Sequence, residues 1–200
     1  MSADPNRRLP DGLFVSFEGV EGSGKSTQIE RLAAWLEEAG HSVTIAREPG
    51  TTEVGEWIRR FLLDTAPDEL APEAELALFV AARAQLAAEV IRPALAEGRV
   101  VLVDRFGDSS TAYQGYGYGL DPERVEEWNA WATDGLEPDL TVLIDVPVSE
   151  GAVRRGGRAP DRLERRSRAY HERVREGYDQ LARNHSDRFC VIEGRRSIGE

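Results

Sequence analysis

The segment GVEGSGKS at residues 19–26 restricts the fold of this chain more than any other feature. It has the pattern G-x-x-x-x-G-K-[ST]; the apolar run LFVSFE precedes it, and a helical pattern follows it. Glycines in such a loop let successive backbone N–H groups point toward one place, and the N-terminus of the next helix adds partial positive charge. The segment therefore predicts a strand, a phosphate-binding loop and a helix in direct succession.

Lys25, inside this loop, is the only lysine in a chain with 25 basic residues. A compact ammonium group on a flexible stem can reach the β- and γ-phosphate oxygens of a nucleotide, whereas a wide planar guanidinium suits this position less well. Elsewhere, arginine bias from a GC-rich genome and adaptation to high salt explain the lack of lysine equally well. The residues predicted to bind the nucleotide are Gly19, Val20, Glu21, Gly22, Ser23, Gly24, Lys25, Ser26 and Thr27.

Five apolar runs alternate with helical patterns along the chain. The runs are continuous rather than alternating, which is typical of strands that are covered on both faces and hence of a parallel sheet between layers of helices. Amphipathic spacing and terminating glycines predict the helices. The predicted strands are residues 13–18, 42–46, 100–104, 139–146 and 188–192, and the predicted helices after the loop helix are 53–63, 72–97 and 161–184.

Composition limits the classes of partner. A length of 200 residues with 40% hydrophobic content suits one domain, predicted here as residues 13–200. The net charge of −11 disfavours nucleic acid as a partner, and no run reaches the roughly 18 apolar residues of a membrane span. A single cysteine, Cys190, excludes an intrachain disulfide and is typical of the cytoplasm. Residues 1–12 lack an apolar segment and are expected to be a flexible leader rather than a secretory signal.

A phosphate-binding loop alone is compatible with a kinase, a guanine-nucleotide switch or a motor ATPase. A guanine-specific switch normally carries Asn-Lys-x-Asp, and this chain has no lysine outside the loop. A motor ATPase usually needs a longer chain. These points favour a kinase that acts on a small molecule.

Three further segments, residues 47–64, 78–85 and 104–121, extend this interpretation. Together with the loop they resemble bacterial thymidylate kinase, of the P-loop nucleoside monophosphate kinase family, over about residues 13–193. The third segment is the most specific, because it has Asp-Arg-aromatic followed by Ser-Ser-x-Ala-Tyr-Gln-Gly. The resemblance implies a P-loop NTPase fold with a five-stranded parallel sheet in the order 2-3-1-4-5. It also implies phosphorylation of dTMP to dTDP with ATP and Mg²⁺ in dTTP biosynthesis, and a homodimer for which helix 72–97 is a candidate face.

Asp104 and Arg105 follow directly on an apolar run. A carboxylate at this strand end can hold Mg²⁺ together with Ser26, although it could instead cap the next segment. The resemblance implies that Arg105 grips the acceptor phosphate, which a guanidinium fork suits; the alternative is a surface ion pair.

Phe79 and Arg83 are four residues apart in a helical pattern and so share a face. The resemblance implies that Phe79 stacks on thymine and that Arg83 donates to a base carbonyl, whereas the alternative is a core phenylalanine beside an arginine with a buried stem. Family resemblance also implies base and sugar recognition by Ser110, Tyr113 and Gln114, and a place near the transferred phosphoryl group for Arg47 and Glu48.

Residues 148–160 are rich in glycine and arginine and are predicted to be a mobile surface segment. The resemblance implies a lid of about residues 148–162 that closes over the nucleotides and supplies cations. Such an arginine contributes on the order of 10³–10⁵ in rate in related phosphoryl transfers. The predicted catalytic residues are Lys25, Arg105, Arg155, Arg158 and Arg162, and the sequence does not decide between the three from the lid.

Some positions depart from the family pattern. Ala82 and Leu86 replace an aspartate and a histidine beside Arg83, which predicts a less firmly oriented guanidinium. Two alternatives to dTMP kinase therefore stay open: another nucleotide or nucleoside kinase of the same fold, and a nucleotide-binding module without turnover.

Overall fold

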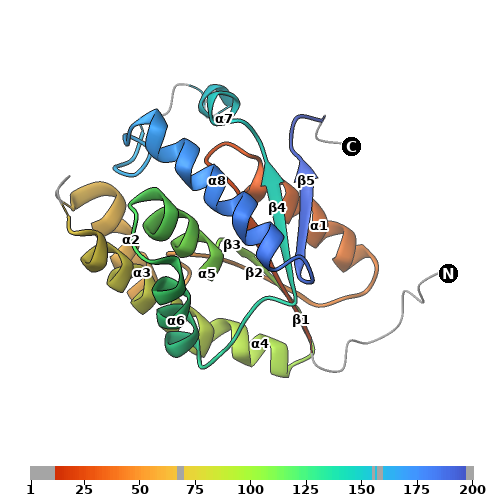
Figure 1. Cartoon of the computed structure of the whole chain (residues 1–200). Helices are drawn as coiled ribbons and strands as arrows, with labels where there is room; N and C mark the ends of the chain where they lie inside the picture. The colour runs from red at the N-terminus through yellow and green to blue at the C-terminus, as the bar shows by residue number, and fades with distance from the viewer. Residues whose placement is uncertain (1–11, 67–69, 155, 157–159, 197–200) are drawn as a thin grey trace.

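The computed structural model describes residues 12–66, 70–154, 156 and 160–196. Five strands form one parallel sheet in the order β2-β3-β1-β4-β5, which confirms the predicted fold class and strand order (Figure 1). The strands are β1 (Leu13–Glu18), β2 (Val43–Arg47), β3 (Val100–Asp104), β4 (Leu140–Asp145) and β5 (Phe189–Glu193). The predicted leader lies outside the described residues except for residue 12.

Helices pack on both faces of this sheet (Figure 1). The α-helices are α1 (Lys25–Glu38), α2 (Glu53–Arg60), α3 (Pro72–Leu86), α4 (Arg92–Ala96), α5 (Gly107–Ser110), α6 (Pro122–Thr133), α7 (Val148–Arg154) and α8 (Arg168–Asn184). Three π-helical segments connect or extend them: η1 (Phe61–Thr65), η2 (Ala87–Ile91) and η3 (Thr111–Gly117).

The alternating sides of β1 explain the two layers. Val15 and Phe17 pack against α1, whereas Phe14, which precedes Val15, packs against η2, α4 and Phe106 on the opposite face. Successive side chains of a strand point to opposite faces, so a run that is apolar at every position needs cover on both. The edge strand β5 differs, because Val191 and Ile192 are about half exposed and belong to none of the hydrophobic clusters of the described residues.

Two predicted helices have different boundaries in the structure, because residues within them or at their ends change the pattern of backbone hydrogen bonds. The predicted helix 72–97 is α3, η2 and α4 in succession, and Pro93, which has no N–H to donate, lies just after the π-helical segment. Helix α8 begins at Arg168 rather than residue 161, because the Ser167 side chain caps it by accepting from the Tyr170 N–H.

Helix α6 was not predicted, although the sequence signals its start. Asp121 accepts a hydrogen bond from the Glu123 N–H, and Pro122 occupies the first turn. A capping aspartate followed by proline is a recognised helix start. In the part of the chain that the structure describes, no helix is long and apolar enough to cross a membrane.

Candidate active site

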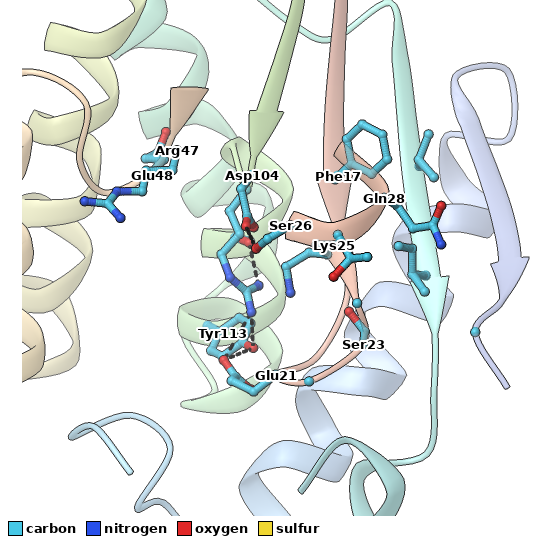
Figure 2. A pocket seen from close by; sticks show the side chains of 18 of the residues that line it. Phe17, Glu21, Ser23, Lys25, Ser26, Gln28, Arg47, Glu48, Asp104 and Tyr113 are labelled. Carbon is cyan, nitrogen blue, oxygen red and sulfur yellow. Dashed lines mark hydrogen bonds and ion pairs between the residues drawn. The ribbon is translucent and has the colours of Figure 1, made fainter. Parts of the chain in front are cut away.

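A cavity of about 1260 Å³ lies at the carboxyl ends of β1, β2 and β3 (Figure 2). Open parallel sheets bind ligands at this edge, next to the strand where the chain order reverses. The phosphate-binding loop forms one wall, and residues from α2, α3 and η3 form the other. All eight residues predicted to bind the second substrate line it: Arg47, Glu48, Phe79, Arg83, Arg105, Ser110, Tyr113 and Gln114.

The loop wall carries a buried cation and buried polar groups. Lys25 Nζ donates to the carbonyl oxygens of Gly19 and Val20 at 3.2 Å each. Burial and the neighbouring Arg105 lower the pKa of Lys25 to about 8, and nearby carboxylates oppose this. The Ser23 hydroxyl is buried and has no hydrogen-bond partner among the described residues. An anion in the loop would stabilise the charged lysine and satisfy such a group, so the wall fits a phosphate group.

Ser26, at the start of α1, and Asp104, at the end of β3, lie side by side, and Ser26 Oγ donates to Asp104 Oδ2 at 2.7 Å (Figure 2). A hydroxyl and a carboxylate oxygen are ligands that Mg²⁺ prefers. In the described part of the chain, no group of three or more His, Cys, Asp or Glu residues could hold a metal ion. The pair therefore fits an ion that takes its other ligands from phosphate and water.

Arg105 reaches from the end of β3 toward the loop. Its Nη2 atom donates to Glu21 Oε1 at 3.1 Å, and its guanidinium lies 4.9 Å from the centre of the Tyr113 ring. Burial alone would raise the pKa of Glu21, but Arg105 and Lys25 outweigh it and lower that pKa. Arg105 has a φ of +72°, a backbone conformation that costs an L-residue about 1–2 kcal/mol. The fold thus keeps Arg105 in a strained backbone conformation that places its side chain over the cavity.

Arg83 is fully buried and forms a bidentate ion pair with Glu48. It also donates to the side-chain oxygens of Asn129 and Ser110. Its orientation is therefore fixed without a carboxylate at residue 82, and the expectation of a loosely held guanidinium is wrong. Burial raises the pKa of Glu48, and Arg83 opposes the shift.

Arg47 and Glu48, predicted side by side, have separate partners. Arg47 pairs with Glu56 on α2, with 2.8 Å between Nη2 and Oε1, and its side chain is about half exposed. In Figure 2 it extends away from Asp104. Consecutive residues at a strand end point in opposite directions, which explains why Glu48 turns into the core and Arg47 does not.

Arg162 does not line the cavity. It is buried, pairs with Glu75 of α3, and donates through Nε to the Leu62 carbonyl oxygen at 2.8 Å. The first half of the predicted mobile segment is helix α7. Arg155 and Arg158 lie outside the described residues, so their predicted role stays a prediction.

Sequence reasoning missed Arg59, which also lines the cavity, as does Arg154 of the predicted lid. Arg59 Nη1 donates to the Pro49 carbonyl oxygen at 3.0 Å, and burial, with Arg47 nearby, lowers its pKa. Its position four residues after the buried Gly55 puts it on the inner face of α2, a spacing that could have identified it.

Glu18, buried at the end of β1, provides a test of the site's electrostatics by pH. Burial, helped by Asp108 and opposed by Arg105, raises its pKa to about 7 from the ordinary 4.5. Between these values the native state binds more protons than the unfolded state, so this carboxyl group makes the free energy of unfolding fall as pH rises. We expect the wild type to lose stability relative to Glu18→Gln from about pH 5 to about pH 8 in urea unfolding. A difference that stays constant with pH would contradict the shift.

Comparison with known proteins agrees with this geometry. The family model described as "Thymidylate kinase" matches residues 17–200. The chain is 48% identical over 193 residues to a thymidylate kinase of Nitratidesulfovibrio vulgaris (strain DP4), covering 92% of this chain and 86% of that protein. It is 50% identical to that of Desulfovibrio desulfuricans over 90% and 87% of the two chains. The crystal structure of thymidylate kinase from Ehrlichia chaffeensis superimposes with a TM-score of 0.76 at 35% identity, over 92% of this chain and 93% of that one. The phosphate-binding loop, the cationic wall that faces it and these matches together show that the chain belongs to the thymidylate kinase family.

Proposed function

We propose that this chain transfers the γ-phosphoryl group of ATP to dTMP, with Mg²⁺, and so supplies dTDP for dTTP biosynthesis. One observation carries the proposal: a phosphate-binding loop faces a second wall of cations and an aromatic ring across a single cavity. Its volume of about 1260 Å³ exceeds the roughly 300–1000 Å³ of a pocket for one small ligand. It therefore has room for two nucleotides placed end to end.

The donor nucleotide belongs on the loop wall. Lys25 and the backbone N–H groups of the loop would hold the β- and γ-phosphates, as in other loops of this pattern. Ser26 and Asp104 would hold Mg²⁺, which neutralises charge on the phosphate oxygens when bound. The hydrogen bond between these two side chains supports their assignment as a pair.

The acceptor nucleotide belongs on the opposite wall. Phe79, which is largely buried and lines the cavity, would stack on thymine, and Gln114 and Ser110 line the same cavity. Arg105 and Arg59 offer guanidinium groups to the acceptor phosphate. Arg83 supports this wall through Glu48, and its interactions with protein groups favour a positioning role.

The proposed transfer needs no nucleophile from the protein. Phosphoryl transfer between two nucleotides depends on alignment of the reacting oxygens and on cations that match the developing charge. Arg154 lines the cavity from α7, and Arg155 follows it in sequence. We keep Arg155 and Arg158 as the proposed lid cations; Arg162 has a buried ion pair instead.

A direct assay tests the activity. The protein is mixed with ATP and Mg²⁺ and with dTMP, dUMP, UMP, CMP or thymidine, and ADP is measured. We expect ADP with dTMP at the highest kcat/KM of the panel. A higher value for another acceptor would favour a different nucleotide kinase, and binding of both nucleotides without ADP would favour a binding module.

Helix α7 rests on the phosphate-binding loop, and Gly151 makes this contact possible. A Cβ atom at Gly151 would overlap the Glu21 carbonyl oxygen, and one at Gly22 would overlap the Gly151 carbonyl oxygen. Gly151→Ala should therefore displace the loop and raise the KM for ATP about tenfold, or about 1.4 kcal/mol. Steady-state kinetics would check this, with Val153→Ala on the exposed side of α7 as the control. An unchanged KM for ATP would show that the loop does not depend on this contact.

We also propose that the chain forms a homodimer and acts in the cytoplasm. Helix α3 packs between α2 and α6 (Figure 1). Trp57 of α2 and Trp128 and Trp131 of α6 are exposed. Exposed aromatic side chains of this size favour a protein interface. Sedimentation of the wild type and of Trp131→Glu would test the dimer, and the single cysteine supports the location.

A further inference from the structure

Glu18 is a buried carboxylate that belongs neither to the phosphate-binding loop nor to the acceptor wall of the cavity. Its Oε1 atom accepts from the Phe106 N–H at 2.8 Å. Its Oε2 atom accepts from Ser109 Oγ at 2.6 Å and from the Tyr178 hydroxyl at 2.8 Å. No ion pair within the described residues includes Glu18, so its partners are a backbone amide and two hydroxyl groups.

Both hydroxyl groups also contact Arg105. Its Nη1 atom donates to Ser109 Oγ at 3.1 Å and to the Tyr178 oxygen at 3.0 Å. A hydroxyl group has one proton to donate and lone pairs to accept with, and a guanidinium can only donate. The hydroxyl oxygens therefore accept from Arg105, and their protons must go elsewhere.

The carboxylate of Glu18 receives those protons. The two hydroxyl oxygens are 2.9 Å apart, so one hydroxyl group can instead donate to the other. In that arrangement the second hydroxyl group still donates to Glu18, so the hydrogen bonds end at this carboxylate in both cases. The same pattern occurs at the other end of the guanidinium. There the Tyr113 hydroxyl donates to Glu21 at 2.5 Å and accepts from Arg105 Nη2 at 3.1 Å.

Glu18 also fixes the main chain next to Arg105. The Arg105 N–H donates to the Phe17 carbonyl oxygen at 3.1 Å, and the Phe106 N–H donates to Glu18. The amides on both sides of the left-handed Arg105 are thus attached to the last two residues of β1. A strained backbone persists only where its surroundings hold it in this way.

We propose that Glu18, acting through the hydroxyl groups of Ser109 and Tyr178, is a positioning residue that aims Arg105 at the acceptor phosphate. This inference rests on the proposed role of Arg105. The direct ion pair of Arg105, with Glu21, is made by Nη2, whereas Glu18 orients the Nη1 end through two neutral hydroxyl groups and so leaves Nη1 free of direct contact with a carboxylate. A carboxylate in direct contact at this point would compete with the phosphate.

Glu18→Gln, assayed at about pH 8 where the wild-type carboxyl group is ionised, is the main test. The amide oxygen can still accept from Phe106 N–H, but the NH₂ group would donate to hydroxyls that already accept from Arg105. We expect the KM for dTMP to rise about tenfold while the KM for ATP changes less than about twofold, which corresponds to about 1.4 kcal/mol at the acceptor side only. Tyr178→Phe should have a smaller effect of the same kind, and it replaces the main test if Glu18→Gln does not fold. Tyr116→Phe removes a hydroxyl group outside this network and is the matched control.

A mutant cycle with Arg105→Ala separates this inference from the proposed function. If Glu18 acts through Arg105, then Glu18→Gln and Tyr178→Phe have little further effect on kcat/KM in the Arg105→Ala background. Additive losses, or equal rises in the KM of both nucleotides, would overturn the positioning role alone. An unchanged KM for dTMP in Arg105→Ala itself would overturn the acceptor assignment, and this inference with it.

Discussion

Replacing Arg105 by alanine is expected to lower kcat/KM for dTMP by about 10²–10³-fold, the usual loss when one preorganised donor to a reacting group is removed. The guanidinium group lines the cavity and is held there by Glu21 and Tyr113. The affinity for ATP should change less than about twofold, because the loop residues around Lys25 remain. Steady-state kinetics with varied dTMP and calorimetric binding of an ATP analogue measure the two effects separately.

Two further variants define what Arg105 supplies. Arg105→Lys keeps the charge but loses the planar fork, so we expect intermediate activity. Arg92→Ala removes an arginine of α4 that contacts the Thr133 carbonyl oxygen away from the cavity, and should leave kcat/KM unchanged. Equal loss of dTMP turnover and ATP affinity in Arg105→Ala would argue against its place on the acceptor wall.

The second large effect is expected on stability. Arg162→Met should lower the free energy of unfolding by about 3–5 kcal/mol, because it leaves the fully buried Glu75 carboxylate without its cation. Adding Glu75→Leu should restore most of that loss, since an apolar pair can replace a buried ion pair. Urea unfolding followed by circular dichroism measures both variants.

This experiment also tests the role that the sequence predicted for Arg162. A catalytic lid arginine would lower kcat on replacement and leave stability nearly unchanged. Arg168→Met is the matched control, because Arg168 forms an exposed pair with Glu172 that is worth about 0–1 kcal/mol. An Arg162→Met protein as stable as this control would contradict the buried pair.

The sequence predicted the sheet well because the burial of each strand is visible in its own short run of apolar residues. Continuous apolar runs located all five strands to within one residue at each end, and the loop pattern located the donor wall. The same local logic failed where helices change register, as at η2 before Pro93, because a π-helical segment leaves no period of its own in the pattern.

The acceptor wall was predictable in its residues but not in its pairings. All eight predicted residues line the cavity, but their partners were not predicted: Glu48 pairs with Arg83, and Arg47 pairs with Glu56. Arg162 finds its partner Glu75 at a separation of 87 residues. Such pairings depend on how whole elements pack, and a charged residue in the sequence looks the same whether it faces solvent, a ligand or a buried counter-ion.

The placement of the aromatic residues determines which optical signal will report on this protein. All four tryptophans, Trp35, Trp57, Trp128 and Trp131, face solvent, and no described residue that lines the cavity is a tryptophan. Indole emission should therefore shift little on denaturation or on nucleotide addition, and respond mainly when two chains associate. Phenol absorbance, by contrast, arises partly from the buried Tyr113 and Tyr178, which contact Arg105, and from Tyr170, which packs against Tyr113; it is the better spectroscopic probe of the site.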